Sequence, residues 1–260
     1  MEQRFAFDQV ARAYQAVRPD YSDALIDDVI AYAGLRSGDV ILDVGCGTGQ
    51  ATKSFATRGF AMLALDPGPQ MIGAAREALA AFPDVAFAEA TFEAWSPAAT
   101  PFRLITAAQS WHWVSPDMGF AKAAEVLASD GTLAVFGHVP VGLDPPLLAQ
   151  FKQIYQRHIG YQGPPPEAWY LPDGPFKPAF EASAFFGPVT HRCYPWQWRH
   201  TTASYLAFLR TRSDHQVMAP AQRAAVFDAI ATAIDGYGGA FAFDYETHLY
   251  MAHRASAERA

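Results

Sequence analysis

Three glycines at alternate positions follow a short apolar stretch and could bring a ligand close to the main chain. The segment reads Val40-Ile41-Leu42-Asp43-Val44-Gly45-Cys46-Gly47-Thr48-Gly49-Gln50. Glycine adopts positive φ at little steric cost and has no side chain to hold a ligand away. A helix that begins behind this turn would offer free backbone N–H groups to the same ligand. The pattern is typical of a strand, turn and helix that bind a dinucleotide or an adenosyl cofactor.

The spacing of these glycines distinguishes the two kinds of cofactor. A dinucleotide-binding turn has the pattern G-x-G-x-x-G, whose third glycine lets the helix pack against the strand near the pyrophosphate. Gln50 stands where that third glycine is required. Asp43 precedes the turn, and its carboxylate would repel a pyrophosphate but suit the cationic amino group of a methionine moiety. These residues favour an adenosyl cofactor over NAD.

A second acid, Asp66, ends the next apolar stretch, Leu63-Ala64-Leu65-Asp66-Pro67. An acid at this place can accept hydrogen bonds from both ribose hydroxyls, although the same argument holds for NAD. Asp66 alone could be only a helix cap, and the glycines could form a turn without a ligand. The combination of two acids with three alternate glycines favours a binding site, with Asp66 on the ribose.

These residues resemble the glycine motif of the class I S-adenosylmethionine-dependent methyltransferases. The resemblance covers most of Phe7–Phe136 and, more loosely, Thr201–Arg254. It implies that S-adenosylmethionine is the cofactor, that Met71 packs on the adenine, and that Thr91 contacts the adenine amine, a position where the family often has Asp. The motif and the resemblance together give these expected cofactor-binding residues: Tyr14, Arg18, Asp43, Gly45, Cys46, Gly47, Gly49, Gln50, Asp66, Pro67, Met71, Thr91, Phe92 and Gln109.

Two further segments are similar to the methyltransferase type 11 subfamily that includes trans-aconitate methyltransferase-like proteins. One is Ala108-Gln109-Ser110-Trp111-His112-Trp113, and the other is the N-terminal opening with Phe7, Asp8 and Tyr21, where a helix closes over the cofactor. Tyr14 and Arg18 are one helical turn apart and should face the same way. The resemblance implies that they line the entrance, with Arg18 near the carboxylate of the methionine moiety. The alternative is a core tyrosine and a surface arginine.

His112, between Trp111 and Trp113, is the candidate catalytic residue. A hydroxyl or amine acceptor must lose a proton, and histidine has a reference pKa near the operating pH of such a base. A carboxylate acceptor is already ionised and would need no base. Our preferred interpretation is that His112 shapes the substrate pocket, with catalysis as the alternative. The expected substrate-pocket residues are Trp111, His112, Trp113 and Trp198.

The second half of the chain adds aromatic and basic residues that could contact a substrate. Tyr194, Trp196 and Trp198 alternate along a predicted strand and should share one face. Most of them should be core, although an aromatic face near a sulfonium would gain from cation–π attraction. Four residues could bind an anionic substrate but are by default surface residues: Arg199, His200, Arg210 and Arg212.

Apolar runs alternate with amphipathic stretches along the first half of the chain, which favours βαβ units and a buried parallel sheet. A first helix carries Phe7, Val10, Tyr14 and Val17, and a second runs from Ser22 as N-cap to Gly34. The predicted strands are Val40–Val44, Ala61–Leu65, Val85–Ala88, Leu104–Ala107 and Thr132–Phe136. The predicted helices between them are Gln50–Arg58, Pro69–Ala80 and Met118–Ala128.

The regular alternation ends near Val139, and a proline-rich passage follows, with Pro145-Pro146 and Pro164-Pro165-Pro166. Helices are predicted at Leu147–His158, Thr201–Thr211 and Ala219–Ala233. Strands are predicted at Val189–Trp198 and at Tyr245–Ala252, which should end the sheet.

The fold class is therefore α/β, with a doubly wound, seven-stranded, mostly parallel, Rossmann-like sheet and a helical cap in the C-terminal half. Residues 1–139 should form the S-adenosylmethionine-binding core with the N-terminal helices. Residues 140–260 should form the cap and the last strands of the same sheet, and not a separate domain, because no separable linker precedes them.

Composition limits the partners of the protein. The 260 residues carry a net charge of −7, whereas nucleic-acid binding depends mainly on a basic surface, so a nucleic-acid partner is disfavoured. Cys46 and Cys193 give no disulfide framework, and we find no metal-ligand spacing. No run approaches the roughly 18 apolar residues of a membrane span, and the N-terminus lacks a signal-peptide core. We expect a cytoplasmic protein without a membrane partner.

The expected reaction is methyl transfer from S-adenosylmethionine to a small-molecule acceptor by in-line displacement. A carboxylate or a hydroxyl fits best, and carboxyl methylation rests on analogy with the subfamily alone. One alternative is a non-catalytic protein that still binds S-adenosylmethionine. A less favoured alternative is an NAD-dependent oxidoreductase.

Overall fold

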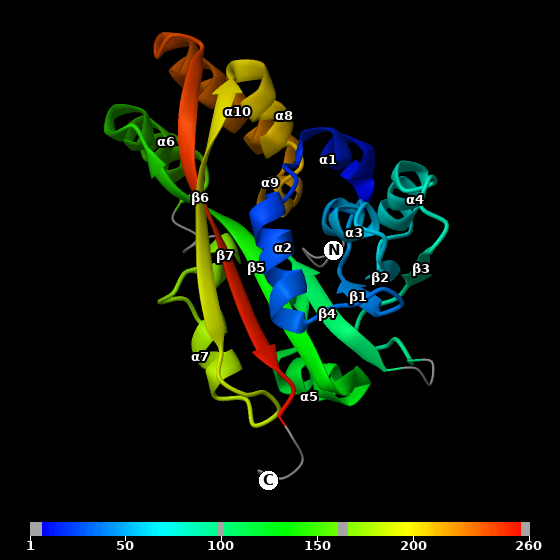
Figure 1. The fold of residues 1–260 in the computed structure, drawn as a ribbon. Coiled ribbons are helices and arrows are strands. Elements are labelled where there is room, and N and C mark those ends of the chain that lie inside the picture. The colour runs from blue at the N-terminus through cyan, green and yellow to red at the C-terminus, as the bar shows by residue number, and fades with distance from the viewer. Residues whose placement is uncertain (1–6, 98–100, 161–165, 256–260) are drawn as a thin grey trace.

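The computed structural model describes residues 7–97, 101–160 and 166–255, and a seven-stranded sheet runs through them (Figure 1). The strand order is β3-β2-β1-β4-β5-β7-β6. The strands are β1 (Val40–Val44), β2 (Ala61–Asp66), β3 (Val85–Glu89), β4 (Phe102–Ala108), β5 (Leu127–Leu143), β6 (Thr190–Thr201) and β7 (Ala240–His253). The predicted α/β class with seven strands is confirmed.

The sheet is parallel except for one strand. β1 pairs in parallel with β2 and β4, β2 with β3, and β4 with β5, whereas β7 is antiparallel to both β5 and β6. The prediction that the closing strand ends the sheet is wrong, because β7 lies between β5 and β6 and leaves β6 at the edge. The connection from β5 to β6 leaves the position beside β5 open, and β7 fills it as the antiparallel neighbour of both strands.

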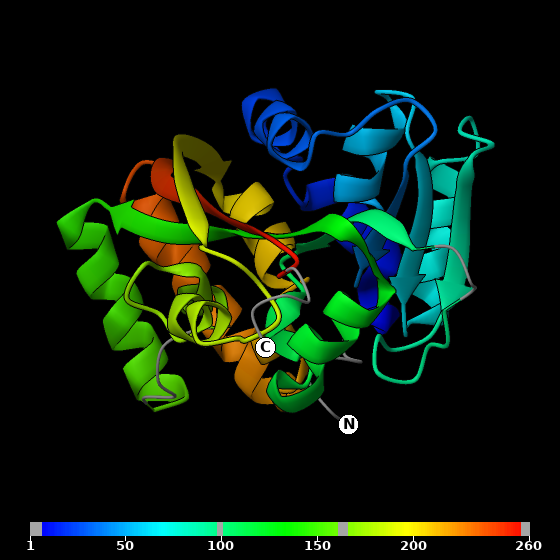
Figure 2. The ribbon, with the colours of Figure 1, turned by 60° about the horizontal axis from the view of Figure 1, so that its bottom comes forward.

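Helices cover both faces of the sheet (Figure 2). Apolar residues of α2, α3 and α4 pack on one face, and those of α5 and α7 pack on the other. The helices are α1 (Ala11–Val17), α2 (Asp23–Ala33), α3 (Gln50–Ala56), α4 (Pro69–Ala78), α5 (Pro116–Val126), α6 (Pro145–His158), α7 (Phe176–Glu181), α8 (Thr202–Leu209), α9 (Ser213–Gln216) and α10 (Pro220–Gly236). Short 3-10 segments are η2 (Asp8–Val10), η3 (Trp111–Trp113) and η4 (Pro166–Tyr170). Within the described ranges, no helix has the length and apolar character that crossing a bilayer requires.

The predicted ends of α2 are confirmed in atomic detail. The Ser22 hydroxyl accepts a hydrogen bond from the Leu25 N–H (3.3 Å), which satisfies one of the free donors at the helix start. Gly34 ends the helix in the left-handed region with φ 58°. The apolar face of the helix is buried, with Leu25, Ile26 and Val29 fully inaccessible.

β5 is much longer than the predicted Thr132–Phe136 and continues to Leu143. The strand continues through Gly137 and Pro140, although both residue types are unfavourable inside a sheet. In the structure the extension pairs only with antiparallel β7, and the pairing has an irregularity between Pro140 and Gly142 that accommodates the proline. The preceding helix was predicted to reach Ala128 but ends at Val126, and β5 begins at Leu127.

The extended ends of β5, β6 and β7 carry the cap (Figure 1). Helices α6, α8 and α10 pack around them through an apolar cluster separate from that of the sheet, which includes Leu147, Phe208, Ile230 and Phe241. We propose on this basis that residues 140–260 form a cap and the last strands of one sheet. The short helices α7 and α9 were not predicted, and Pro164 and Pro165 lie outside the described residues.

The main chain of β5 at Gly137 is closely surrounded by side chains. A Cβ at this position would lie 2.2 Å from Gln109 Oε1 and 2.6 Å from Tyr170 Cδ2. We expect Gly137→Ala to lower the free energy of unfolding by about 1–3 kcal/mol, because the side chains must move apart. Urea denaturation would measure this.

Gly73→Ala is the matched control, since a Cβ there has no atom within 4 Å and the residue lies inside α4. That change should leave stability unchanged or raise it by up to about 1 kcal/mol. Equal effects of the two substitutions would contradict the packing described for Gly137.

Candidate active site

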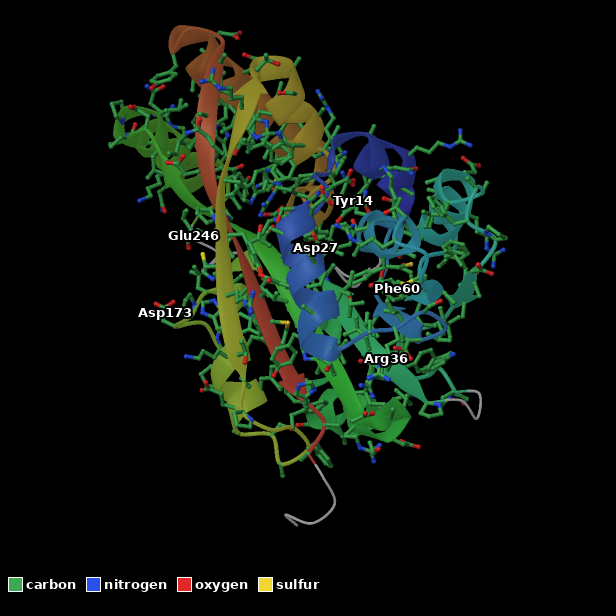
Figure 3. The ribbon with its side chains drawn as sticks, in the orientation of Figure 1. Tyr14, Asp27, Arg36, Phe60, Asp173 and Glu246 are labelled. Carbon is green, nitrogen blue, oxygen red and sulfur yellow. The ribbon has the colours of Figure 1, made fainter. Side chains whose placement is uncertain are left out.

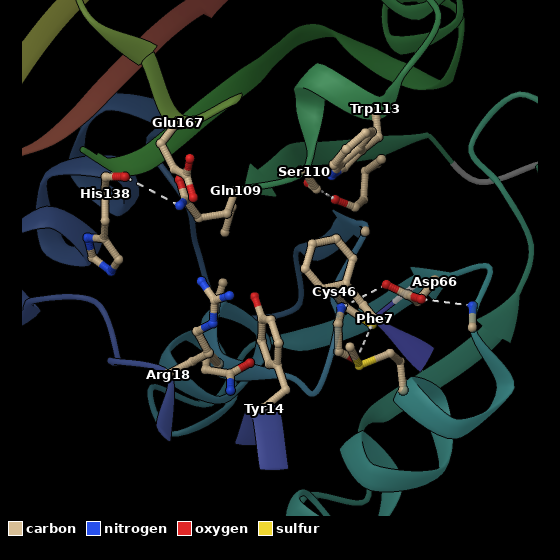
Figure 4. A pocket seen from close by; sticks show the side chains of 18 of the residues that line it. Phe7, Tyr14, Arg18, Cys46, Asp66, Gln109, Ser110, Trp113, His138 and Glu167 are labelled. Carbon is tan, nitrogen blue, oxygen red and sulfur yellow. Dashed lines mark hydrogen bonds between the residues drawn. The ribbon is translucent and has the colours of Figure 1, made fainter. Parts of the chain in front are cut away.

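A deep cavity opens at the carboxyl ends of the parallel strands, next to the point where the chain order reverses between β1 and β4 (Figure 4). Open α/β sheets bind their ligands at this point. The cavity holds about 1350 Å³ of space not filled by protein atoms, part of it open to solvent. We call one part the turn end, lined by Gly45, Gly47, Asp66, Met71, Thr91 and Phe92, and the other the cap end, lined by His138, Glu167, Trp198, Phe208, Arg212 and Tyr245.

The glycine turn has the backbone conformation that its sequence predicts. Gly45, Gly47 and Gly49 have φ values of 68°, 56° and 90°, all in the region that favours glycine. A Cβ on Gly45 would lie 2.5 Å from the Ser110 Cβ, so β1 and the segment after β4 approach each other closely here. A Cβ on Gly47 would meet no atom within 4 Å, which leaves the main chain open to the cavity.

Asp66 holds this turn in place. Its Oδ2 accepts a hydrogen bond from the Gly47 N–H (2.9 Å), and its Oδ1 accepts one from the Gly68 N–H (2.8 Å). A carboxylate has about four acceptor sites, so each oxygen keeps capacity for a further donor. Burial raises the pKa of Asp66 to about 6, although both backbone N–H groups oppose the rise. The side chain lines the cavity and suits the two hydroxyls of a ribose.

Asp43 occupies a different position from the one expected. Its side chain is fully buried behind the turn and does not line the cavity. Its Oδ2 accepts a hydrogen bond from the Thr52 hydroxyl of α3 (2.6 Å), and burial raises its pKa to about 7. Oδ2 thus joins β1 to α3, whereas Oδ1 has no hydrogen-bond partner among the described residues, so contact between Asp43 and a methionine amino group stays a prediction. Gly49 also does not line the cavity, because it is the N-cap residue that precedes α3.

The other expected cofactor residues line the cavity: Tyr14, Arg18, Gly45, Cys46, Gly47, Gln50, Asp66, Pro67, Met71, Thr91, Phe92 and Gln109. Met71 is nearly buried and packs with Ala11 of α1. Asp8 also lines this end, and its Oδ1 accepts hydrogen bonds from the Gln70 and Met71 N–H groups at the start of α4. Sequence reasoning missed this role of Asp8, because nothing in the local pattern relates it to a helix 62 residues away.

Helix α1 closes one side of the cavity and is tied to the cap through Arg18. The Arg18 Nε donates to the Thr211 hydroxyl (3.1 Å), and its terminal nitrogen donates to the Thr211 carbonyl (3.0 Å). The guanidinium lies 4.5 Å from the ring centre of Tyr14 and 4.7 Å from that of Phe208. No carboxylate of the described residues forms an ion pair with Arg18. Its positive charge is thus available to a bound anion.

Gln109 has an unusual backbone conformation at the end of β4. Its φ is 57°, and no other non-glycine residue in the described ranges has a positive φ. Its side-chain Nε2 donates to the His138 carbonyl (3.3 Å), while its Oε1 is buried without a hydrogen-bond partner among the described residues. A positive φ strains the backbone of a non-glycine residue, and this strain persists only where the surrounding structure imposes it. Strained residues of this kind are common at functional sites.

The segment after Gln109 only partly matches the expected substrate pocket. Trp113 and Trp198 line the cavity, as expected. Trp111 does not, because it is nearly buried against Phe92 and Phe120, so its assignment to the pocket is corrected.

His112 lines a smaller hollow beside the cavity rather than the cavity itself. Its Nδ1 is hydrogen-bonded to the Tyr170 hydroxyl (3.0 Å). Burial lowers the pKa of His112 to about 4. The imidazole is therefore neutral near pH 7 and a weak proton acceptor, which favours a structural role over the catalytic one.

The cap end combines Arg212, a candidate from the sequence, with two polar residues that the sequence did not reveal, Glu167 and His138. Arg212 is paired with both Glu167 (3.0 Å) and Asp214 (2.9 Å), so its charge is neutralised within the protein. Glu167 Oε2 is buried without a hydrogen-bond partner among the described residues. His138 stacks on Tyr21, and burial lowers its pKa to about 3. These residues come from β5, η4 and the α8–α9 connection, and no sequence spacing relates them to one another.

The charges that line the cavity also discriminate between cofactors. Asp8, Asp66 and Glu93 line the turn end. The cations among the described lining residues are Arg18 and Arg212, and both lie with the cap. Three acids around the turn would repel a pyrophosphate, whereas an adenosyl ligand carries no phosphate there. The geometry supports an adenosyl ligand over a dinucleotide.

Comparisons with known proteins agree with this geometry. Residues 41–131 match a family model described as a methyltransferase domain. An uncharacterized methyltransferase of Mycobacterium tuberculosis is 32% identical over 130 residues, which cover 50% of this chain and 51% of that protein. A trans-aconitate 2-methyltransferase of Afipia carboxidovorans is 33% identical over 132 residues, which cover 50% of this chain and 49% of that protein. The chain thus spans about half the length of these curated relatives.

Solved structures share the fold. A protein of Anaeromyxobacter dehalogenans described as a candidate type II methyltransferase aligns with a TM-score of 0.64 at 21% identity, over 91% of this chain and 97% of that one. Haemonchus contortus phosphoethanolamine N-methyltransferase 2, with S-adenosylhomocysteine bound, aligns with a TM-score of 0.57 at 11% identity, over 98% of this chain and 61% of that one. Residues 41–131 are thus similar to a methyltransferase domain, and the chain shares the fold of solved methyltransferases.

The raised pKa of Asp66 leads to a pH-dependent prediction for S-adenosylhomocysteine as a probe. The Asp66 carboxylate, which we expect to accept the ribose hydroxyls, is present above about pH 6 and is lost by protonation below it. We expect the Kd, measured by calorimetry, to rise about tenfold between pH 7.5 and pH 5 if only the ionised form binds.

Asp66→Asn should bind weakly with little pH dependence, because the amide does not titrate. Glu89→Gln, at the exposed register partner of Asp66 on β3, is the matched control and should keep the dependence. An undiminished pH effect in Asp66→Asn would assign it to another group, such as Asp43.

Proposed function

We propose that this protein transfers a methyl group from S-adenosylmethionine to an oxygen atom of a small molecule. The observation that carries the proposal is the continuity of one cavity, from the ribose-compatible carboxylate of Asp66 to the aromatic wall formed by Trp198, Phe208 and Tyr245. One cavity can then hold both partners of a transfer reaction.

The residues of the chain would bind, align and shield the reactants. S-adenosylmethionine supplies a methyl group on a sulfonium, which is already a good leaving group. The protein must therefore mainly hold the acceptor in line with that methyl group and exclude water. Asp66 and the glycine turn would fix the nucleoside, and the contact between Arg18 and Thr211 closes α1 onto the cap.

The charge arrangement bears on the nature of the acceptor. The trans-aconitate 2-methyltransferases among the relatives suggest a carboxylate. In this cavity, however, Arg212 is already paired with two acids, and Arg18 is the one lining cation of the described residues without an ion-pair partner. If Arg18 binds the carboxylate of the methionine moiety, no free cation remains for an acceptor carboxylate. A neutral hydroxyl is then the better acceptor.

A hydroxyl acceptor also matches the unpaired polar atoms near the cap. Glu167 Oε2 and Gln109 Oε1 are both buried acceptors without a hydrogen-bond partner among the described residues, and both residues line the cavity. A buried acceptor without a partner costs free energy that a bound O–H group would recover. We propose that Glu167 orients the acceptor hydroxyl and accepts its proton as the oxygen–methyl bond forms and the methyl–sulfur bond breaks, and that His112 supports Tyr170 rather than acting as the base.

A turnover assay separates catalysis from binding alone. Release of S-adenosylhomocysteine would be measured with panels of small hydroxyl compounds and small carboxylic acids, including trans-aconitate. Acceptor-dependent release supports the proposed reaction, and the active panel identifies the acceptor class. Tight binding of S-adenosylhomocysteine without turnover on any panel would favour the non-catalytic alternative.

Arg18→Met tests which carboxylate this arginine binds. If it contacts the methionine moiety, the affinity for S-adenosylhomocysteine should fall about 10- to 100-fold, because a charge-assisted hydrogen bond is lost. The affinity for 5′-methylthioadenosine, which lacks the amino-acid group, should change little. Parallel calorimetry with both ligands measures the difference and controls for any disturbance of α1.

An equal affinity of wild type and Arg18→Met for S-adenosylhomocysteine would contradict the assignment. Arg18 would then be free for an acceptor carboxylate, and the preference for a hydroxyl would be withdrawn.

A further inference from the structure

Three side chains that can bind a metal ion, those of Cys193, Glu246 and His248, meet on β6 and β7 away from the cavity. Tyr245 lines the cavity, and Thr247 is hydrogen-bonded to the cavity residue His138. Side chains alternate between the two faces of a strand, so Glu246 and His248 point to the opposite face. Cys193 of β6 is directly opposite His248 in the strand register. Figure 3 shows Glu246 beside the strands β6 and β7.

The distances in this cluster suit a single ion. One ligand atom each from Cys193, Glu246 and His248 lie within 4.8 Å of one another. The ligands of a tetrahedral zinc ion are about 3.5 Å apart, given metal–ligand distances near 2.0–2.3 Å. Cys193 is exposed and Glu246 half-buried, so small rotations of these two side chains can close the remaining gap.

His248 is already placed as a ligand. It is only 2% exposed, and its Nε2 is 3.0 Å from Glu246 Oε2 without the alignment of a hydrogen bond. Its other nitrogen, Nδ1, is 3.0 Å from the Nε2 of His191. When Nδ1 donates its proton to His191, the lone pair on Nε2 is free to bind a metal. Histidine ligands are usually oriented by such a second partner.

We propose that Cys193, Glu246 and His248 bind a divalent transition-metal ion of the zinc type, and that His191 is a positioning residue for His248. Thiolate, imidazole and carboxylate together are typical zinc ligands, whereas magnesium and calcium prefer oxygen alone. Three protein ligands leave a fourth position for water. The proposal does not depend on methyl transfer.

Such an ion would fasten the edge of the sheet. β6 is the edge strand, and it is joined to the rest of the sheet through β7 alone. A metal bound by Cys193 of β6 and by Glu246 and His248 of β7 would cross-link the two strands. The cross-link would lie beside the parts of these strands that carry Tyr245 and Trp198. Any ligand that binds only the folded state stabilises it.

Zinc titration of the tag-free, chelator-stripped full-length protein tests the site. We expect one ion bound per chain with micromolar or tighter affinity, and a Tm raised by about 5 °C at saturating zinc. Cobalt(II) provides a second readout, since its thiolate charge-transfer absorption appears only when a cysteine binds the metal. Absence of stoichiometric zinc binding would overturn the proposal.

Variants separate this site from adventitious binding. Cys193→Ser should abolish the thiolate signal, and Cys193→Ser with His248→Gln should abolish binding. His191→Gln should weaken binding about 10-fold or more but keep the stoichiometry, as expected for a residue that orients a ligand. His253→Gln, an exposed position of the same strand β7 on its other face, is the control that should bind zinc normally.

Retention of zinc binding in the double variant would contradict the assignment. Circular dichroism would verify that each variant is folded, and unchanged affinity of Cys193→Ser for S-adenosylhomocysteine would confirm that the two sites are independent.

Discussion

Two backbone N–H groups, from Gly47 and Gly68, donate to the carboxylate of Asp66 and fix the carboxyl ends of β1 and β2 relative to each other. This contact requires the main chain to turn back sharply after β1, which only the positive φ values of the glycines allow. The buried hydrogen bond between Asp43 and Thr52 holds the same turn from behind. These contacts hold the turn in the conformation that leaves the Gly47 main chain open to the cavity.

The acceptor side depends on a different constraint, the length of β5 and β7. Because these strands continue past the parallel sheet, the cap is attached directly to the strands that form the cavity floor. Gly137 makes this continuation compatible with Gln109 and Tyr170, which occupy the space of its missing side chain. Arg18 then connects α1 to Thr211, so that the N-terminal helix and the cap enclose the cavity together.

The sequence was most informative where local pattern determines structure. The apolar strand, the alternate glycines and Asp66 predicted both the turn and its place in a doubly wound sheet, because backbone conformation there depends on adjacent residues. The ends of α2 followed from Ser22 and Gly34 for the same reason.

Long-range packing was outside the reach of the sequence. No local signal shows that Asp43 faces α3 rather than the cavity, that Trp111 is core, or that β7 lies inside β6. The cap residues Glu167 and His138 were missed because they converge only through the extended strands and η4. Cys193 and His248 are 55 residues apart in the chain and are brought opposite each other only by the strand register.

The most direct test of the central claim is calorimetric titration of the protein with S-adenosylhomocysteine and, in parallel, with NAD. The cavity described here predicts micromolar binding of S-adenosylhomocysteine at one site per chain and no measurable binding of NAD. Absence of S-adenosylhomocysteine binding, or preferential binding of NAD, would contradict the assignment of this cavity to an adenosyl cofactor.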